Sequence, residues 1–184
     1  MKWMCTTIMV LGIAAPLLLA ESTGAKFTGK YKVVQVEAPK FKAGIHMLER
    51  EKDAYAQHLA SFAVNQVIEA NASQASLTRA RHLIALALHL SPRNTDAVTA
   101  NRQLSKKQFP VQKRNAFNKA VLSTLLFTRG KELGKDNGEL NQLLAYTFIT
   151  LAVELNPRHV GAVFEISRYE EQWGKLDWAL FTGE

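Results

Sequence analysis

The stretch ALALHLSPRN, residues 85–94, returns in altered form as LAVELNPRHV, residues 151–160. Laid over each other, residues 82–98 and residues 147–163 are identical at eight of 17 positions. Each copy has apolar residues at helical spacing and then a proline, which ends a helix because it lacks an amide donor. Self-similarity at a fixed spacing, here 65 residues, indicates helical units that stack and bury their apolar faces against one another.

The spacing predicts an all-α fold of about six helices in two similar three-helix halves, residues 48–106 and 115–173. In the first half, helices are expected over residues 48–71, over residues 77–90 after a cap among residues 73–76, and from Asn94 or Thr95 to about Lys106. In the second half they are expected over residues 117–133, 140–155 and 160–169, with Asp136 and Glu139 resembling a capping box before the middle helix.

Three segments lie outside these halves. Residues 21–47 are basic and interrupted by glycine and proline, which predicts an extended tether or strap; its strand-like part, residues 31–37, has no sheet to join. Residues 107–114 form the predicted linker between the halves. The aromatic tail, residues 174–184, is expected to fold back and cap the end of the stack, or else to present an aromatic patch to a partner.

Residues 1–20 have the pattern of an export signal. Lys2 precedes an apolar run of signal-peptide length, so we expect cleavage and an exported, periplasmic or extracellular protein. The alternative is a membrane anchor formed by residues 4–20. Cys5 is the only cysteine of the chain, so a processed protein contains no disulfide.

Small and large apolar residues recur in the same order in both halves. The two sets are Ala80, Ile84, Ala87 and Pro92, and Ala145, Ile149, Ala152 and Pro157. This order resembles the second helix of a tetratricopeptide (TPR) repeat, in which alanines allow close helix approach and a proline ends the helix. The spacing here is 65 residues rather than about 34, and the first-helix part of the motif is not recognisable. A TPR-like α-solenoid fragment is therefore predicted, with a plain helical bundle as the alternative.

The TPR resemblance implies a concave groove that holds a peptide or a partner helix and is lined by the first helix of each pair. On that basis the candidate partner-binding residues are Thr99, Gln103, Phe164 and Arg168, to which the tail and its approach add Trp173 and Trp178. The Lys, Asn and Arg pattern with which some family members clamp a terminal carboxylate is absent. The resemblance therefore implies a binding module and leaves the partner unnamed.

Sequence motifs of catalysis are missing. His82 and His89 share a helix face but stand about 10 Å apart, too far to hold one zinc ion alone, and the histidines are expected on partly exposed helix surfaces. No nucleophile elbow or catalytic carboxylate pair stands out. We expect no catalytic residue, no metal and no cofactor, with an enzyme of unrecognised type as a remaining alternative.

The chain carries a formal net charge of +7. Five lysines of the predicted tether are candidates for contact with an anionic surface such as lipid headgroups or glycan: Lys26, Lys30, Lys32, Lys40 and Lys42. Export argues against a nucleic-acid partner. A basic module that binds an anionic surface is thus the first alternative to a scaffold for protein or peptide.

Overall fold

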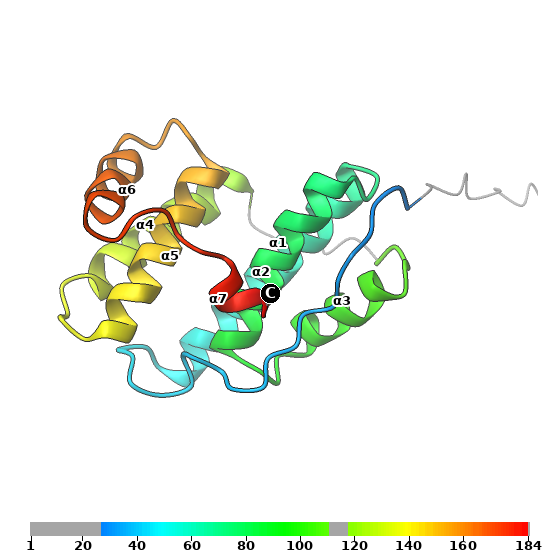
Figure 1. Cartoon of the computed structure of the whole chain (residues 1–184), viewed down its shortest axis with the longest axis horizontal. Helices are drawn as coiled ribbons and strands as arrows, with labels where there is room; N and C mark the ends of the chain where they lie inside the picture. The colour runs from blue at the N-terminus through cyan, green and yellow to red at the C-terminus, as the bar shows by residue number, and fades with distance from the viewer. Residues whose placement is uncertain (1–26, 111–117, 184) are drawn as a thin grey trace, which may run out of the picture.

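The computed structural model describes residues 27–110 and 118–183 of the chain. Over these residues the protein is all-α, with seven helices and no strand, which confirms the predicted fold class (Figure 1). The helices are α1 (Glu49–Glu69), α2 (Gln74–Leu90), α3 (Thr95–Ser105), α4 (Lys119–Leu133), α5 (Glu139–Leu155), α6 (Val160–Trp173) and the short α7 (Ala179–Thr182). The strand-like stretch 31–37 is extended but joins no sheet.

The first six helices form two units of three. Helices α1, α2 and α3 pack on one another, while α5 packs against both α4 and α6. Figure 1 shows the first unit on the right and the second on the left. The units meet at α1, where the ring of Tyr55 stacks on Phe148 of α5 with centroids 5.1 Å apart. Beside this stack, the Glu51 carboxylate lies 2.6 Å from the Arg129 guanidinium of α4.

The turn after the proline-ended helix has the same geometry in both units. Helices α2 and α5 are both 17 residues long, and α5 begins and ends 65 positions after α2. Their C-caps, Ser91 and Asn156, have φ and ψ of −140° and 91°, and of −139° and 86°. The following N-caps, Asn94 and His159, both accept a hydrogen bond from the amide three residues on, at 3.0 and 3.2 Å. The 65-residue similarity therefore extends to backbone conformation.

Small residues set the distance between neighbouring helices. Ala80, Ala87, Ala145 and Ala152 are fully buried, Ile84 and Ile149 are also buried, and Pro92 and Pro157 lie exposed where their helices end. Gly130 of α4 completes the set, because a Cβ there would lie 2.9 Å from Cγ1 of Ile149 and 3.1 Å from the Ala145 carbonyl oxygen. Larger side chains at these positions would separate the helices.

Ala87→Leu tests this close approach. Because Ala87 is fully buried in α2, added methylenes should lower the free energy of unfolding by about 1–3 kcal/mol. Ala75→Leu on the exposed face of the same helix is the matched control and should change it by less than about 0.5 kcal/mol. Urea unfolding followed by circular dichroism measures both; equal effects would contradict the packing described.

The prediction of a capping box at the start of α5 is wrong. The helix starts at Glu139 with Gly138 as its N-cap, and no side chain caps it. Asp136 lies two residues before that cap, where its carboxylate accepts a hydrogen bond from the Gly138 amide at 2.6 Å. The aspartate thus shapes the turn before the helix instead of closing the helix end.

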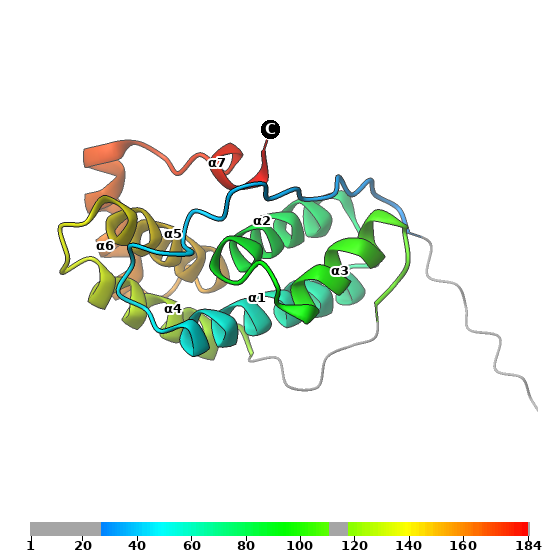
Figure 2. The ribbon, with the colours of Figure 1, turned by 90° about the horizontal axis from the view of Figure 1, so that it is seen from below.

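Residues 27–47, here called the strap, cross the first unit and reach the second before entering α1 (Figure 2). Their backbone forms no helix or strand, so its polar groups need other partners. Asn101 of α3 supplies two of them: its Oδ1 accepts from the Val34 amide at 3.0 Å, and its Nδ2 donates to the Val34 carbonyl at 2.8 Å. Gln74 of α2 pairs with both backbone groups of Lys30 in the same way, at 3.0 and 3.2 Å.

Further along the strap, buried polar side chains continue this pairing. Lys52 of α1 is only 2% exposed, and its ammonium donates to the carbonyls of Phe41 and Lys42 at 3.2 and 2.8 Å. Asn141 of α5 accepts from the His46 amide at 2.8 Å. The strap is therefore bonded to both units, and the buried cation is compensated by oxygen atoms.

Asn101→Leu should detach this part of the strap. The substitution keeps an apolar volume but leaves the Val34 amide and carbonyl without partners, so we expect a loss of at least about 2 kcal/mol in unfolding free energy. Thr99→Ala, on the exposed side of the same helix, is the control and should cost less than about 0.5 kcal/mol. Limited proteolysis within residues 27–47 should become faster in the first variant only.

The tail folds back onto α2 and the strap. His89 of α2, which is buried and not on a partly exposed surface as predicted, lies between them. Its Nδ1 accepts from the Lys40 amide at 3.1 Å, so its Nε2 carries the proton and donates to the Phe181 carbonyl at 3.1 Å. Arg81 donates to the Thr182 carbonyl at 2.8 Å. The tail was expected to cap the end of the stack. Instead, His89 and Arg81 bind its last residues, Phe181 and Thr182, on the first unit.

The His89 contacts require a neutral imidazole, which makes stability depend on pH. Burial is the main cause that lowers the pKa of His89; the hydrogen bond to the Phe181 carbonyl acts in the opposite direction, and nearby Lys40 lowers the pKa to a smaller extent. In the unfolded chain His89 binds a proton near pH 6.5, whereas in the folded chain it stays neutral until a lower pH. The stabilisation from the neutral His89 contacts is therefore complete above about pH 6.5 and is lost as the pH falls below it.

Unfolding measured across mildly acidic to neutral pH should therefore show wild-type stability falling toward acid, and His89→Gln should remove part of that slope. Burial also lowers the pKa of His58, so His58→Gln is measured in parallel to separate the two contributions. An identical slope in wild type and His89→Gln would rule out the neutral His89 contact as a source of the pH dependence.

Candidate binding surface on α6

Helix α6 is the least covered of the long helices. Ala162 is its only buried residue, whereas Phe164 is 66% and Val160 is 82% exposed. Val160, Val163 and Phe164 stand three and four positions apart, so they share one face, here called the α6 strip. The equivalent helix of the first unit, α3, buries four residues: Ala97, Ala100, Asn101 and Leu104. The difference arises because α3 packs on both α1 and α2 and its Asn101 is bonded to the strap, whereas α6 packs mainly on α5.

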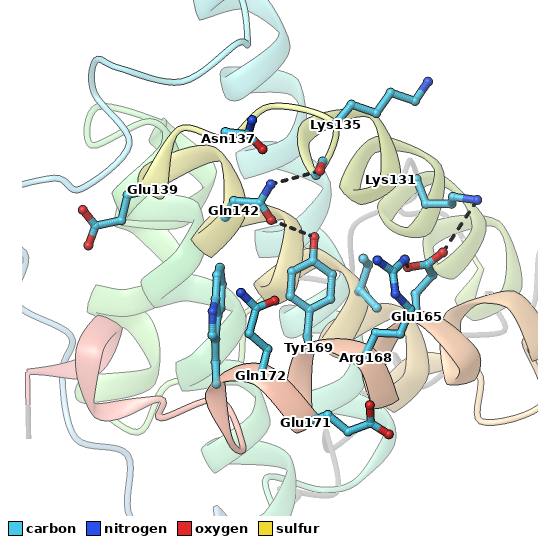
Figure 3. Close-up of a pocket in the computed structure, with 13 residues that line it drawn as sticks. Lys131, Lys135, Asn137, Glu139, Gln142, Glu165, Arg168, Tyr169, Glu171 and Gln172 are labelled. Atoms are coloured by element: carbon cyan, nitrogen blue, oxygen red, sulfur yellow. Dashed lines mark hydrogen bonds and ion pairs between the residues drawn. The ribbon is translucent and has the colours of Figure 1, made fainter.

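A hollow of about 780 Å³ lies beside α6, between it, the end of α4 and the start of α5 (Figure 3). It is lined by Lys131, Gly134, Lys135, Asn137, Glu139, Gln142, Ile149, Glu165, Arg168, Tyr169, Glu171, Gln172 and Trp173. Ile149 is the one aliphatic side chain among them, so the lining is mainly polar and aromatic.

The floor of the hollow is held in place by Gln142 and aromatic rings. Gln142 donates from its Nε2 to the Gly134 carbonyl at 2.9 Å and to that of Asp136, and it accepts from the Tyr169 hydroxyl at 3.3 Å. The Tyr169 ring stacks on Tyr146 with centroids 5.2 Å apart, and Trp173 meets it edge-on at 5.6 Å. Burial raises the pKa of the Tyr169 phenol above its ordinary value, so the hydroxyl remains a donor even in alkaline solution.

The rim carries charges of both signs. Glu165 lies 2.9 Å from Arg168 and 3.8 Å from Lys131, as Figure 3 shows for the lysine. Lys135 pairs with Glu132 outside the hollow at 2.8 Å. Among the lining residues three cations, Lys131, Lys135 and Arg168, stand against three carboxylates, Glu139, Glu165 and Glu171. The hollow therefore has no dominant charge and suits a polar, roughly neutral ligand.

The structure divides the candidate partner-binding residues into separate groups. Phe164, Arg168 and Trp173 all lie on α6, where Arg168 and Trp173 line the hollow. Thr99 and Gln103 lie on α3, and Figures 1 and 2 show α3 and α6 at opposite ends of the molecule. The groove shared by α3 and α6 that the resemblance implied is therefore not formed, because α4 and α5 meet the first unit through α1.

Trp178, the last of the candidate partner-binding residues, lies on the first unit, away from Trp173. It is partly buried and stacks on His82 of α2 with ring centroids 4.4 Å apart. Trp173, by contrast, is 43% exposed at the end of α6. The two tryptophans therefore do not form one exposed aromatic patch.

The lysines expected to meet an anionic surface lie along the strap. Lys30, Lys32 and Lys42 are exposed and Lys40 is partly buried, whereas Lys26 falls outside the described residues. Residues 1–20, with the predicted signal or anchor, fall outside them as well. Within the described part of the chain, no helix is long and apolar enough to cross a membrane.

The residues of the hollow contain no metal-ligand cluster: across residues 27–110 and 118–183, no group of three His, Cys, Asp or Glu is placed to hold an ion. Sequence reasoning missed most of the lining, including Gln142, Glu139 and Tyr169. The 65-residue spacing could have identified them. Each stands 65 positions after a residue of the first unit that is buried or bonded to the strap: Leu77, Gln74 and Leu104.

Comparison with known proteins gives no relative: no protein-family model, no curated protein sequence and no solved structure matches this chain.

Proposed function

We propose that this protein is an exported, non-catalytic helical scaffold that binds another protein or a peptide through α6 and the adjoining hollow. The observation that carries the proposal is the exposure of α6, which buries one residue and presents Phe164 and Val160 beside a polar hollow. An apolar strip bordered by polar and charged groups is the usual composition of a protein interface. The resemblance of both halves to a TPR second helix supports the same kind of function.

The energetics favour a covered α6. Complete burial of a Phe or Val side chain contributes about 1.5–3 kcal/mol, and the α6 strip leaves much of this contribution unused in the isolated chain. A partner that covers Phe164 and Val160 would gain this burial free energy on binding. Trp173, at the other end of α6, offers a further aromatic anchor of the type that dominates interface energies.

The sequence supports the exported part of the proposal. The apolar run after Lys2 supports export, and residues 21–184 contain no cysteine that an oxidising compartment would modify. Binding of an anionic surface by the strap lysines is the second candidate, supported by the exposure of Lys30, Lys32 and Lys42 along one segment. The two candidates differ in salt dependence, because screening weakens attachment through exposed lysines far more than burial of apolar side chains.

A photo-crosslinking amino acid at position 164 tests the scaffold proposal. In the organism that makes the protein, we expect one discrete protein adduct from position 164 and none from position 99, which is also exposed, on α3. Phe164→Glu, read out from a crosslinker at position 160, should reduce the adduct by about tenfold or more, the equivalent of roughly 1.4 kcal/mol. Raising the salt concentration should leave the adduct nearly unchanged.

Two results would count against the proposal. Equal labelling from positions 99 and 164 would indicate that α6 is not a specific surface. Attachment of the protein to anionic vesicles that disappears at high salt, together with no adduct at position 164, would favour the strap lysines instead.

A further inference from the structure

The two units differ in what lies over equivalent grooves. In the first unit the strap lies along α2 and α3, where the Gly29 amide donates to the Ala72 carbonyl at 3.0 Å and Gln74 pairs with both backbone groups of Lys30. The fit is close, since a Cβ on Gly29 would lie 2.5 Å from Cδ1 of Leu77. This groove therefore binds an extended peptide segment that belongs to the same chain.

The equivalent residues of the second unit line the hollow. Ala72, Gln74 and Leu77 correspond, 65 positions later, to Asn137, Glu139 and Gln142. All three line the hollow, and Figure 3 shows them on the loop and the first turn of α5. Because the bounds of α2 and α5 and the turns after them repeat at the same spacing, the correspondence is structural as well as sequential.

We infer that the hollow beside α6 binds an extended peptide segment of a partner protein, in the manner in which the first unit binds its own strap. The inference rests on the proposed function and specifies its ligand. Polar groups able to pair with a backbone are present at one end of the groove: Asn137 and Gln172 are exposed side-chain amides, and Glu139 stands where Gln74 pairs with the strap. Asn101 has no polar counterpart, because Ile166 stands 65 positions after it, so the pairing is expected at the start of α5. These groups accept and donate in the manner that backbone amides and carbonyls require.

The lining also indicates what kind of segment fits. Gln142 replaces Leu77 in the floor, and the rim holds three cations and three carboxylates. A segment with polar side chains is therefore favoured over one that inserts apolar side chains, as the strap does with Val34. Glu139 accepts an amide hydrogen but, unlike Gln74, donates none. Tyr169 and Trp173 supply flat surfaces against which an extended backbone or a planar side chain packs.

Selection from a library of short linear peptides displayed on phage, with the full chain as bait, tests this inference. The selected peptides should lack helical periodicity, and N-methylation of one central backbone amide should weaken binding by about tenfold. Glu139→Ala should weaken it several-fold, whereas Glu139→Gln, which restores the amide found in the first unit, should bind at least as tightly as wild type. Glu69→Ala removes an exposed carboxylate from the end of α1, outside the hollow, and should have no effect.

Other outcomes separate this inference from the proposed function. Peptides that bind as helices, respond to Phe164→Glu and ignore both Glu139→Ala and N-methylation would overturn the inference and leave the scaffold proposal standing. Failure to select any peptide, with a protein adduct still formed at position 164, would also overturn the inference and leave the scaffold proposal standing. Binding of soluble glycans in the hollow, competed by no selected peptide and accompanied by no adduct at position 164, would overturn both.

Discussion

An extended backbone buried against helices must have its amide and carbonyl groups satisfied, and in this protein side chains do so. Asn101, Gln74, Lys52, His89 and Asn141 bond the strap at intervals from Lys30 to His46. They come from four different helices in both units. Without them the strap would carry unpaired polar groups over an apolar core.

This requirement explains why polar residues occupy the interior of the first unit. Lys52, His89 and Asn101 are buried in helices whose other inward positions are mostly apolar, and each bonds a backbone atom of the strap. His89 also bonds the Phe181 carbonyl, so the strap and the tail are fixed by the same ring. The second unit has the same helix turns without such a covering segment among the described residues, and its hollow is lined by counterparts of the residues that contact the strap. The exposure of the α6 strip has another origin, because the equivalent residues of α3, Thr95, Val98 and Thr99, are exposed as well.

The repeat made much of the fold predictable from sequence. Apolar spacing with Pro92 and Pro157 located the helices and their ends, because both are local properties of the chain. The strap contacts were not predictable: Asn101 and His89 resemble ordinary helix-surface residues until their partners, far away in sequence, are known. The family resemblance grouped Thr99 with Phe164, which the structure separates, since it described a continuous stack and the two units meet at α1 instead.

Amide hydrogen exchange in the strap tests side-chain pairing of the backbone most directly. The amides of Val34, Lys40 and His46 donate to Asn101, His89 and Asn141, although none belongs to a helix or strand. They should exchange far more slowly than amides of an unfolded peptide at the same pH, at rates that approach those of the core helices. Exchange of all three at unfolded-peptide rates would contradict the pairing, and with it the inference that the second groove binds an extended segment.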